Sequence, residues 1–219
     1  MYEDTETNAT IAEDEIMNTL ATDETDHLLI TRFKAGSMDA MEKIVERYED
    51  QIFTFGLKMC GHLQDAEDIV QETFLNAFKY LNDFREETKL RNWLFKIAAR
   101  VCFRKRRKKK FEPERELSLE SFVLKDGLSS SYDIPDLSNN PSEQLERNEL
   151  KQIINKSILS LPPKYRFVFN LRDIEGFSTK EASEILGITA QTVKTRLHRA
   201  RLFLREKISE QFNEGEAVR

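Results

Sequence analysis

A set of hydrogen-bonding and positively charged side chains recurs between residues 190 and 205. Their donor and acceptor groups suit base edges and phosphates: Gln191, Lys194, Thr195, Arg196, His198 and Arg199. The stretch 190–205 contains five Lys or Arg and no Asp or Glu. Their spacing places these side chains together on one side of a helix. A helix of this kind, held by a short partner helix, fits a DNA major groove.

The residues around this helix predict how it is held. An apolar stripe occupies its other side: Val193, Leu197, Ala200 and Leu204. Upstream, Ser178 and Glu181 have the spacing of a capping box, which starts a short helix carrying Ala182, Ile185 and Leu186. Gly187 ends that helix and Thr189 caps the next. The alternative is an ordinary helix pair of an all-α protein with a solvated basic face.

Charge is strongly segregated along the chain. The protein has 219 residues, 33% of them charged, and a net charge of −5. Residues 1–31 contain nine Asp or Glu and no Lys or Arg, whereas residues 89–110 contain eleven Lys or Arg and no Asp or Glu. Nucleic acids bind to local patches of positive charge, so the negative net charge of the whole chain does not argue against nucleic-acid binding.

The composition indicates a soluble, cytoplasmic protein. No apolar run approaches the roughly 20 residues of a membrane span, and the acidic N-terminus is unlike a signal peptide. Cys60 and Cys102 lie in helical, partly apolar patterns and are expected to be buried, reduced thiols, with one disulfide left open.

Only seven Gly and five Pro, with few alternating runs, predict an all-α fold. We expect two small helical domains joined by a flexible acidic linker, the second ending in a helix-turn-helix. The predicted parts are an acidic disordered tail at 1–25, a first domain at 26–110, the linker at 111–141 and a second domain at 142–212. The tail has one alternative function, as an acidic mimic of nucleic acid that competes for a basic groove.

A carboxylate row marks the helical pattern expected within the stretch HLQDAEDIVQETFLNAFKYLNDF, residues 62–84. It faces away from an apolar stripe and comprises Asp65, Glu67, Asp68, Gln71, Glu72 and Asn76. Such a row is either a solvated face, with early acids favoured by the helix dipole, or a docking face for a basic partner. The sequence does not favour either of these two interpretations.

A dense basic run ends the next expected helix. Trp93 and its apolar neighbours can pack on the preceding helices, whereas Lys96, Arg100 and the run 104–110 cannot be buried unpaired. We predict that the run contacts phosphates and makes binding sensitive to salt. The alternative is a frayed, solvated helix end.

Two separated motifs resemble bacterial sigma factors. DAEDIVQETFLNAF, followed by a loop and LRNWLFKIA, resembles region two; LPPKYRFVFNLRDIEGFSTKEASEILGITAQTVKTRLHRARLFLRE resembles region four. Their order, with only a linker between them, is that of the extracytoplasmic-function (ECF) group. The resemblance covers about 26–110 and 142–210.

The resemblance implies roles for the residues above. The carboxylate helix would bind the clamp helices of the polymerase largest subunit, through Asp65, Asp68, Gln71 and Glu72. The loop around Phe84 to Thr88 would capture a flipped base of the minus-ten element, and the basic helix would follow the DNA strands. The implied minus-ten residues are Phe84, Arg85, Thr88, Trp93, Lys96, Arg100 and Arg104.

In region four, the resemblance implies that four exposed positions read the minus-thirty-five element: Lys194, Thr195, His198 and Arg199. Arg196 is better placed for phosphate, and Gln191 belongs to the same surface. The chain departs from the family at Arg100, where Asn is common, and in its unusually dense basic run.

These roles describe a promoter-specificity subunit that binds core RNA polymerase, including its flap, and promoter DNA, and catalyses nothing. The family also implies an anti-sigma factor as a partner. The alternative is a helix-turn-helix regulator that never joins polymerase. An enzyme is disfavoured because His27, His62 and His198 lack metal-ligand spacing and no phosphate-binding Gly loop is present. We therefore expect no metal, cofactor or small-molecule substrate.

Overall fold

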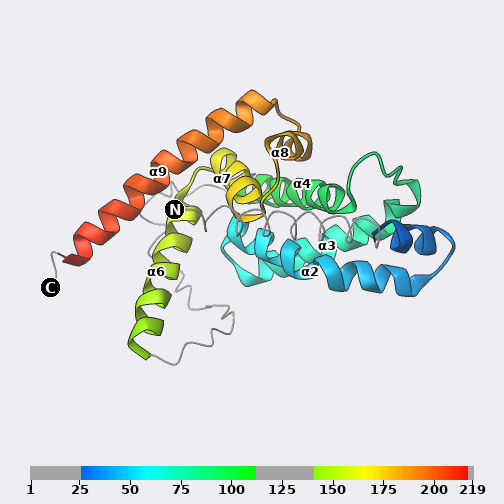
Figure 1. Cartoon of the computed structure of the whole chain (residues 1–219), viewed down its shortest axis with the longest axis horizontal. Coiled ribbons are helices and arrows are strands. Elements are labelled where there is room, and N and C mark those ends of the chain that lie inside the picture. The colour runs from blue at the N-terminus through cyan, green and yellow to red at the C-terminus, as the bar shows by residue number, and fades with distance from the viewer. Residues whose placement is uncertain (1–25, 112–140, 217–219) are drawn as a thin grey trace, which may run out of the picture.

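The computed structural model describes residues 26–111 and 141–216, and within them every regular element is helical (Figure 1). The all-α prediction is therefore confirmed. The expected tail and nearly all of the expected linker lie outside the described residues. No described helix has both the length and the apolarity to cross a membrane.

The first half of the structure is a helical bundle. A helix over 26–34 turns at Gly36, whose φ of 96° is left-handed, into α2 (Met38–Cys60). The α3 helix (Leu63–Tyr80) folds back along α2 and continues through the short turn η1 (Leu81–Asp83). After a loop, α4 (Leu90–Phe111) packs on α3 and α2.

Ser37 occupies the N-cap position of α2, but its side chain makes no capping hydrogen bond. The neighbouring acid Asp39 instead lies in the first turn and pairs with Arg32 of the preceding helix at 3.0 Å. The helix dipole and this ion pair supply favourable interactions at this end.

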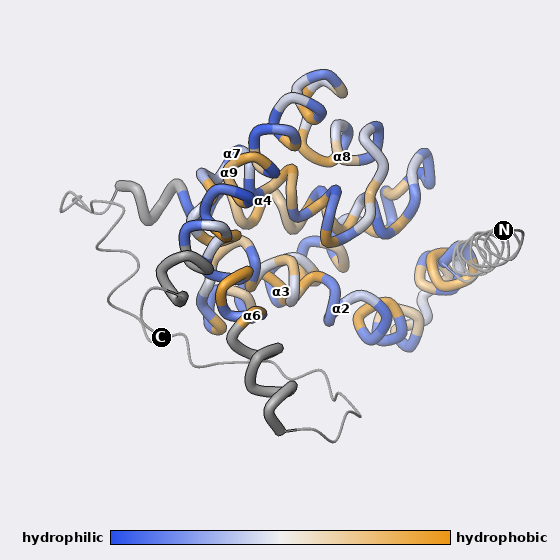
Figure 2. Tube along the Cα trace, turned by 60° about the vertical axis from the view of Figure 1, so that its left-hand side comes forward, coloured by the Kyte–Doolittle hydropathy of each residue, from blue (hydrophilic) through white to orange (hydrophobic). Residues whose placement is uncertain are grey.

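The second half begins with α6 (Pro141–Ser160) and α7 (Pro163–Phe169). A π-helical turn, η2 (Asn170–Ile174), follows α7 directly. The short helix α8 (Thr179–Leu186) and the long helix α9 (Ala190–Glu216) then form the predicted helix-turn-helix. Figure 2 shows apolar and hydrophilic residues alternating along these helices, as amphipathic packing requires.

The capping box of α8 is confirmed. The Glu181 amide donates to Ser178 Oγ at 3.2 Å, and the Ser178 amide donates to Glu181 Oε2 at 2.8 Å. Gly187 ends α8 with a φ of 65°, and the Thr192 amide donates to the Thr189 hydroxyl at the start of α9. Both ends of the turn are thus fixed by local contacts.

Replacing Ser178 with Ala should lower the free energy of unfolding by about 1 kcal/mol, because the Glu181 amide loses its acceptor. Urea denaturation measures this as a lower midpoint. Ser183→Ala is the matched control, since the Ser183 hydroxyl only donates back to the Lys180 carbonyl within α8. An equal loss in both variants would remove the capping box as the cause.

The two halves share one hydrophobic core. Buried side chains of α2 and α4 meet those of α7 and α8 in a single cluster. Phe55 of α2 lies 6.3 Å from Phe167 of α7, and Phe95 of α4 lies 4.8 Å from Phe177, in ring-centroid distance. Phe103 stacks on Phe167 at 3.9 Å. Apolar packing therefore holds the second half against the first, and α8 lies beside α4 (Figure 1).

Polar contacts close the same junction. The Arg91 guanidinium donates to the Glu175 carbonyl at 2.8 Å and to its carboxylate at 3.2 Å, and lies 4.1 Å from the Phe177 ring centroid. Asn92 donates to Glu181 at 3.1 Å. Burial raises the pKa of Glu175 to about 7, and the charge of Arg91 partly opposes this rise. The N-terminal turn of α4 is thereby covered by carboxylates from the second half.

Candidate nucleic-acid interface

The predicted reading face of α9 is exposed. Its apolar stripe is buried, with Val193 and Ala200 fully inaccessible. The opposite side presents the side chains of Gln191, Lys194, Thr195, His198 and Arg199 to solvent, and Arg196 is half-buried at its edge. The amphipathic pattern thus turns the basic face outward, as the sequence predicts.

Two of these side chains are already held in place. The Thr195 hydroxyl donates to the Gln191 carbonyl one turn earlier, at 3.0 Å. Arg199 hydrogen-bonds the hydroxyl of Tyr165 on α7, an interaction that lowers the pKa of this hydroxyl. Lys164 lies over the Tyr165 ring, 5.0 Å from its centroid, and adds a cation beside the face. Lys164 and Tyr165 lie about 30 residues upstream in the chain, so the helical spacing around α9 gives no signal for their contribution to this face.

The predicted minus-ten loop has a buried anchor. Phe84 is only 7% exposed and its ring lies 4.9 Å from that of Trp93, so in this arrangement it supports the loop rather than facing a base. Arg85 is exposed and Thr88 is half-buried. Arg85, Thr88 and Trp93 are therefore the members of the predicted minus-ten set at this loop that retain contact with solvent.

The N-terminal helix fixes this loop from the other side. Lys34 donates to the Phe84 carbonyl at 2.6 Å, and His27 lies 2.6 Å from the Glu86 carboxylate. Glu86 itself has a left-handed φ of 58°, an uncommon conformation for a residue with a side chain. The sequence gives no local signal for these contacts, because the partners are 50 and 59 residues apart.

The basic face of α4 starts beyond this loop. Lys96 is half-buried, Arg100 is exposed, and both precede the basic run. Arg104 forms an ion pair with Glu72, and Lys105 pairs with Asp68 at 2.5 Å. The first cations of the run are therefore neither frayed nor unpaired. The side chains of residues 107–110 are outside the described set.

These pairs change the interpretation of the carboxylate row on α3. Asp65, Asp68 and Glu72 are half-exposed and Gln71 is exposed, so the row does face outward. Nevertheless, Asp68 and Glu72 face the basic run of α4 and are not simply solvated. A basic partner that binds this row must compete with Arg104 and Lys105 or bind beside them.

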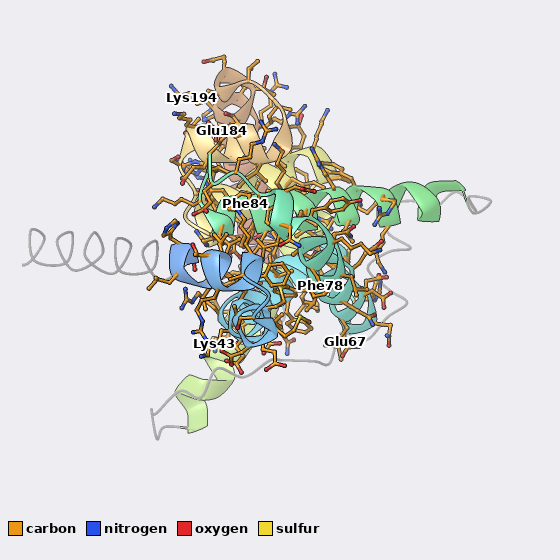
Figure 3. The ribbon with its side chains drawn as sticks, turned by 90° about the vertical axis from the view of Figure 1, so that its right-hand side faces the viewer. Lys43, Glu67, Phe78, Phe84, Glu184 and Lys194 are labelled. Carbon is orange, nitrogen blue, oxygen red and sulfur yellow. The ribbon has the colours of Figure 1, made fainter. Side chains whose placement is uncertain are left out.

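The acidic face of α3 and the basic face of α9 lie on different sides of the molecule. Figure 3 shows Glu67 of α3 and Lys194 of α9 at opposite ends of the molecule, with Phe84 between them. One chain thus presents an acidic protein-binding candidate and a basic DNA-binding candidate in separate places. Across the described residues, no cluster of three metal-ligating side chains is found.

Comparisons with known proteins agree with both halves. Residues 44–112 match the model of Sigma-70 region 2, and residues 151–204 match that of Sigma-70, region 4. Together they cover more than half of the chain.

Two relatives are similar over most of their length. The ECF RNA polymerase sigma factor SigW of Bacillus subtilis is 37% identical over 179 residues, covering 82% of this chain and 94% of SigW. The RNA polymerase sigma-H factor of Pseudomonas aeruginosa is 27% identical, with 83% of this chain and 93% of the relative covered.

Solved structures share the fold. CnrH, solved in complex with the cytosolic domain of CnrY, has a TM-score of 0.58 at 22% identity, over 85% of this chain and 98% of CnrH. RpoE of Bartonella quintana, solved with the anti-sigma factor NepR, has a TM-score of 0.59 at 22% identity, over 77% and 96%. The chain belongs to the extracytoplasmic-function sigma factors, which are not enzymes but bind core RNA polymerase and direct promoter-specific transcription initiation.

Proposed function

We propose that three surfaces divide the work of this sigma factor. The acidic face of α3 binds the clamp helices of the polymerase largest subunit through Asp65, Asp68, Gln71 and Glu72. The minus-ten surface consists of Arg85, Thr88, Trp93, Lys96, Arg100 and Arg104, with Phe84 packed beneath it as a support. The minus-thirty-five face consists of Gln191, Lys194, Thr195, Arg196, His198 and Arg199.

The exposed, acid-free face of α9 is the observation that carries this proposal. Its polar side chains project from a helix whose other side is buried in the core, so their backbone positions are fixed before DNA binds. Lys194 and Arg199 supply donors for guanine O6 and N7, and Thr195 can contact either a base or a thymine methyl group. Arg196, at the edge, suits phosphate.

Reading both promoter elements requires the two halves to separate. Elements centred about 25 base pairs apart lie about 85 Å apart along B-DNA at ~3.4 Å per pair. A compact chain of this length has a radius of gyration of only about 17 Å, too small to span that distance. The 29 residues between α4 and α6 reach up to about 95 Å when extended, which is sufficient.

We therefore propose that the arrangement in which the two halves share one core exists before the protein binds a promoter. In it, Glu175 and Glu181 cover Arg91 and Asn92 at the start of α4. The domain division at 26–110 and 142–212 supplies the two units that separate, and the polymerase flap is the proposed partner of the second.

CnrH and the Bartonella RpoE were each solved with a binding protein, and we propose an anti-sigma factor for this chain as well. Each of these events belongs in the cytoplasm, where we place the protein.

Replacing Lys194 or Arg199 with Ala should relax selectivity at the minus-thirty-five element by about 1–3 kcal/mol, the value of a good base contact. Competition between promoter variants for the reconstituted holoenzyme measures this difference. Lys207→Ala is the control, since Lys207 lies farther along α9 and pairs with Glu210. Unchanged selectivity in both test variants would exclude these residues from base reading.

Neutralising the basic run from Arg104 to Lys110 should weaken DNA binding across sequences. Each lost phosphate contact lowers the slope of log K against log salt by about 0.9, because fewer counterions are released. Titrating labelled promoter DNA at several salt concentrations gives this slope. A slope identical to that of the wild type would show that the run does not contact phosphates.

A further inference from the structure

Two thiols meet where α2 ends against the middle of α4. Cys60 is the last residue of α2, is half-buried, and packs against the shared core. Cys102 of α4 belongs to that core and is fully buried. Neither is in a disulfide, and their side chains hydrogen-bond one another.

The register of the two helices explains this meeting. Arg106 lies one turn after Cys102 on α4, and its guanidinium donates to the carbonyl of Met59, the neighbour of Cys60, at 3.0 Å. Arg166 of α7 donates to the same carbonyl at 2.8 Å. Two guanidinium groups therefore flank the end of α2, next to Cys60 in the chain.

The two sulfurs differ in access. Cys60 keeps part of its surface exposed to solvent, whereas Cys102 is fully buried. Hydrogen bonding to Cys60 and burial keep the pKa of Cys102 high, so Cys102 remains a protonated thiol. One partly exposed sulfur and one buried sulfur in contact with it are the arrangement of an attacking and a resolving cysteine.

We propose that Cys60 and Cys102 form a redox-active dithiol, oxidised reversibly by hydrogen peroxide to an intramolecular disulfide. The Cys60 thiolate attacks one peroxide oxygen, the O–O bond breaks, and hydroxide leaves and takes up a proton as water. The Cys102 thiol then attacks the Cys60 sulfenic acid, and its proton passes to the departing hydroxide, which leaves as the second water. Two thiols and one peroxide give one disulfide and two waters, and a dithiol reductant reverses the reaction.

The bond would act on the element that carries the minus-ten surface. It joins the end of α2 to α4 beside Arg106, within the first half of the chain, and does not link the two halves covalently. Oxidation therefore leaves the second half able to separate, while it fixes α4 against α2. Intracellular disulfides of this kind are typically transient and redox-sensing.

The test uses the full reduced chain treated with hydrogen peroxide, then quenched, denatured and labelled with a maleimide. The wild type should lose both maleimide sites together and lose two hydrogen atoms in intact mass, at a rate independent of protein concentration. Dithiothreitol should restore both sites. In Cys102→Ala, Cys60 should instead gain oxygen and react with dimedone, and in Cys60→Ser the remaining Cys102 should stay reactive to maleimide after denaturation.

Far-UV circular dichroism confirms that each variant is folded before treatment. Oxygen addition at Cys60 in the wild type, with Cys102 still reactive to maleimide at every peroxide concentration, would overturn the proposal. A disulfide that forms only between two chains, at a concentration-dependent rate, would overturn it as well.

Discussion

Reversing Asp68 and Glu72 to lysine should abolish binding to core RNA polymerase. A basic docking partner would then meet two like charges, which cost several kcal/mol, a loss of about a hundredfold or more in affinity. Copurification of the variant with core polymerase measures the effect directly.

The ion pairs to α4 call for a second variant, because reversal also breaks the contacts of Asp68 with Lys105 and of Glu72 with Arg104. Exchanging the charges, with Lys105→Asp and Arg104→Glu added to the reversal, restores both pairs in opposite order. If the acidic face of α3 binds polymerase, the exchanged variant stays defective. Recovery of core binding in the exchanged variant would show that the carboxylates act only within the chain.

Replacing Glu175 with Gln should stabilise the packed arrangement of the two halves at pH 8 by about 2–3 kcal/mol. This upper limit follows from the raised pKa of Glu175, because each pKa unit corresponds to ~1.4 kcal/mol. Burial raises the pKa of Glu175 from 4.5 to about 7, against the attraction of Arg91. The folded state therefore binds a proton more tightly than the unfolded state. This contribution is fully present below pH 4.5 and is lost as the pH rises through 7, where the buried carboxylate ionises.

Urea unfolding of both proteins at pH 5 and pH 8 measures this difference. The glutamine variant should match the wild type closely at pH 5 and exceed it at pH 8. Glu184→Gln, an exposed carboxyl on α8 (Figure 3), should leave the wild-type behaviour unchanged. A glutamine variant that is less stable than the wild type at pH 8 would show that the pair with Arg91 outweighs the cost of burial.

Local signals in the sequence predict most of the fold. The capping box at Ser178 and Glu181, the left-handed Gly187 and the apolar stripe of α9 each depend on residues within a few positions. Such patterns are set by backbone hydrogen bonding and helical periodicity, and the structure confirms all three. The exposed face of α9 follows from them, because burying the stripe leaves only one side for the polar residues.

Contacts between distant segments could not be predicted in this way. The pairing of Asp68 with Lys105 and of Arg91 with Glu175 joins residues 37 and 84 positions apart. Their meeting depends on how α3, α4 and η2 pack, which periodicity does not specify. The same limit explains why Phe84 is buried under Trp93 and why Cys60 is half-exposed where burial was expected.

Transcription by the reconstituted holoenzyme tests the central claim most directly. Purified core polymerase with this chain should start transcripts at discrete promoters, and changing either the minus-ten or the minus-thirty-five element should abolish them. Lys194→Ala should shift preference at the upstream element alone. The sigma-factor function would be contradicted if the chain binds DNA but the transcripts are no more promoter-specific than those of core polymerase alone.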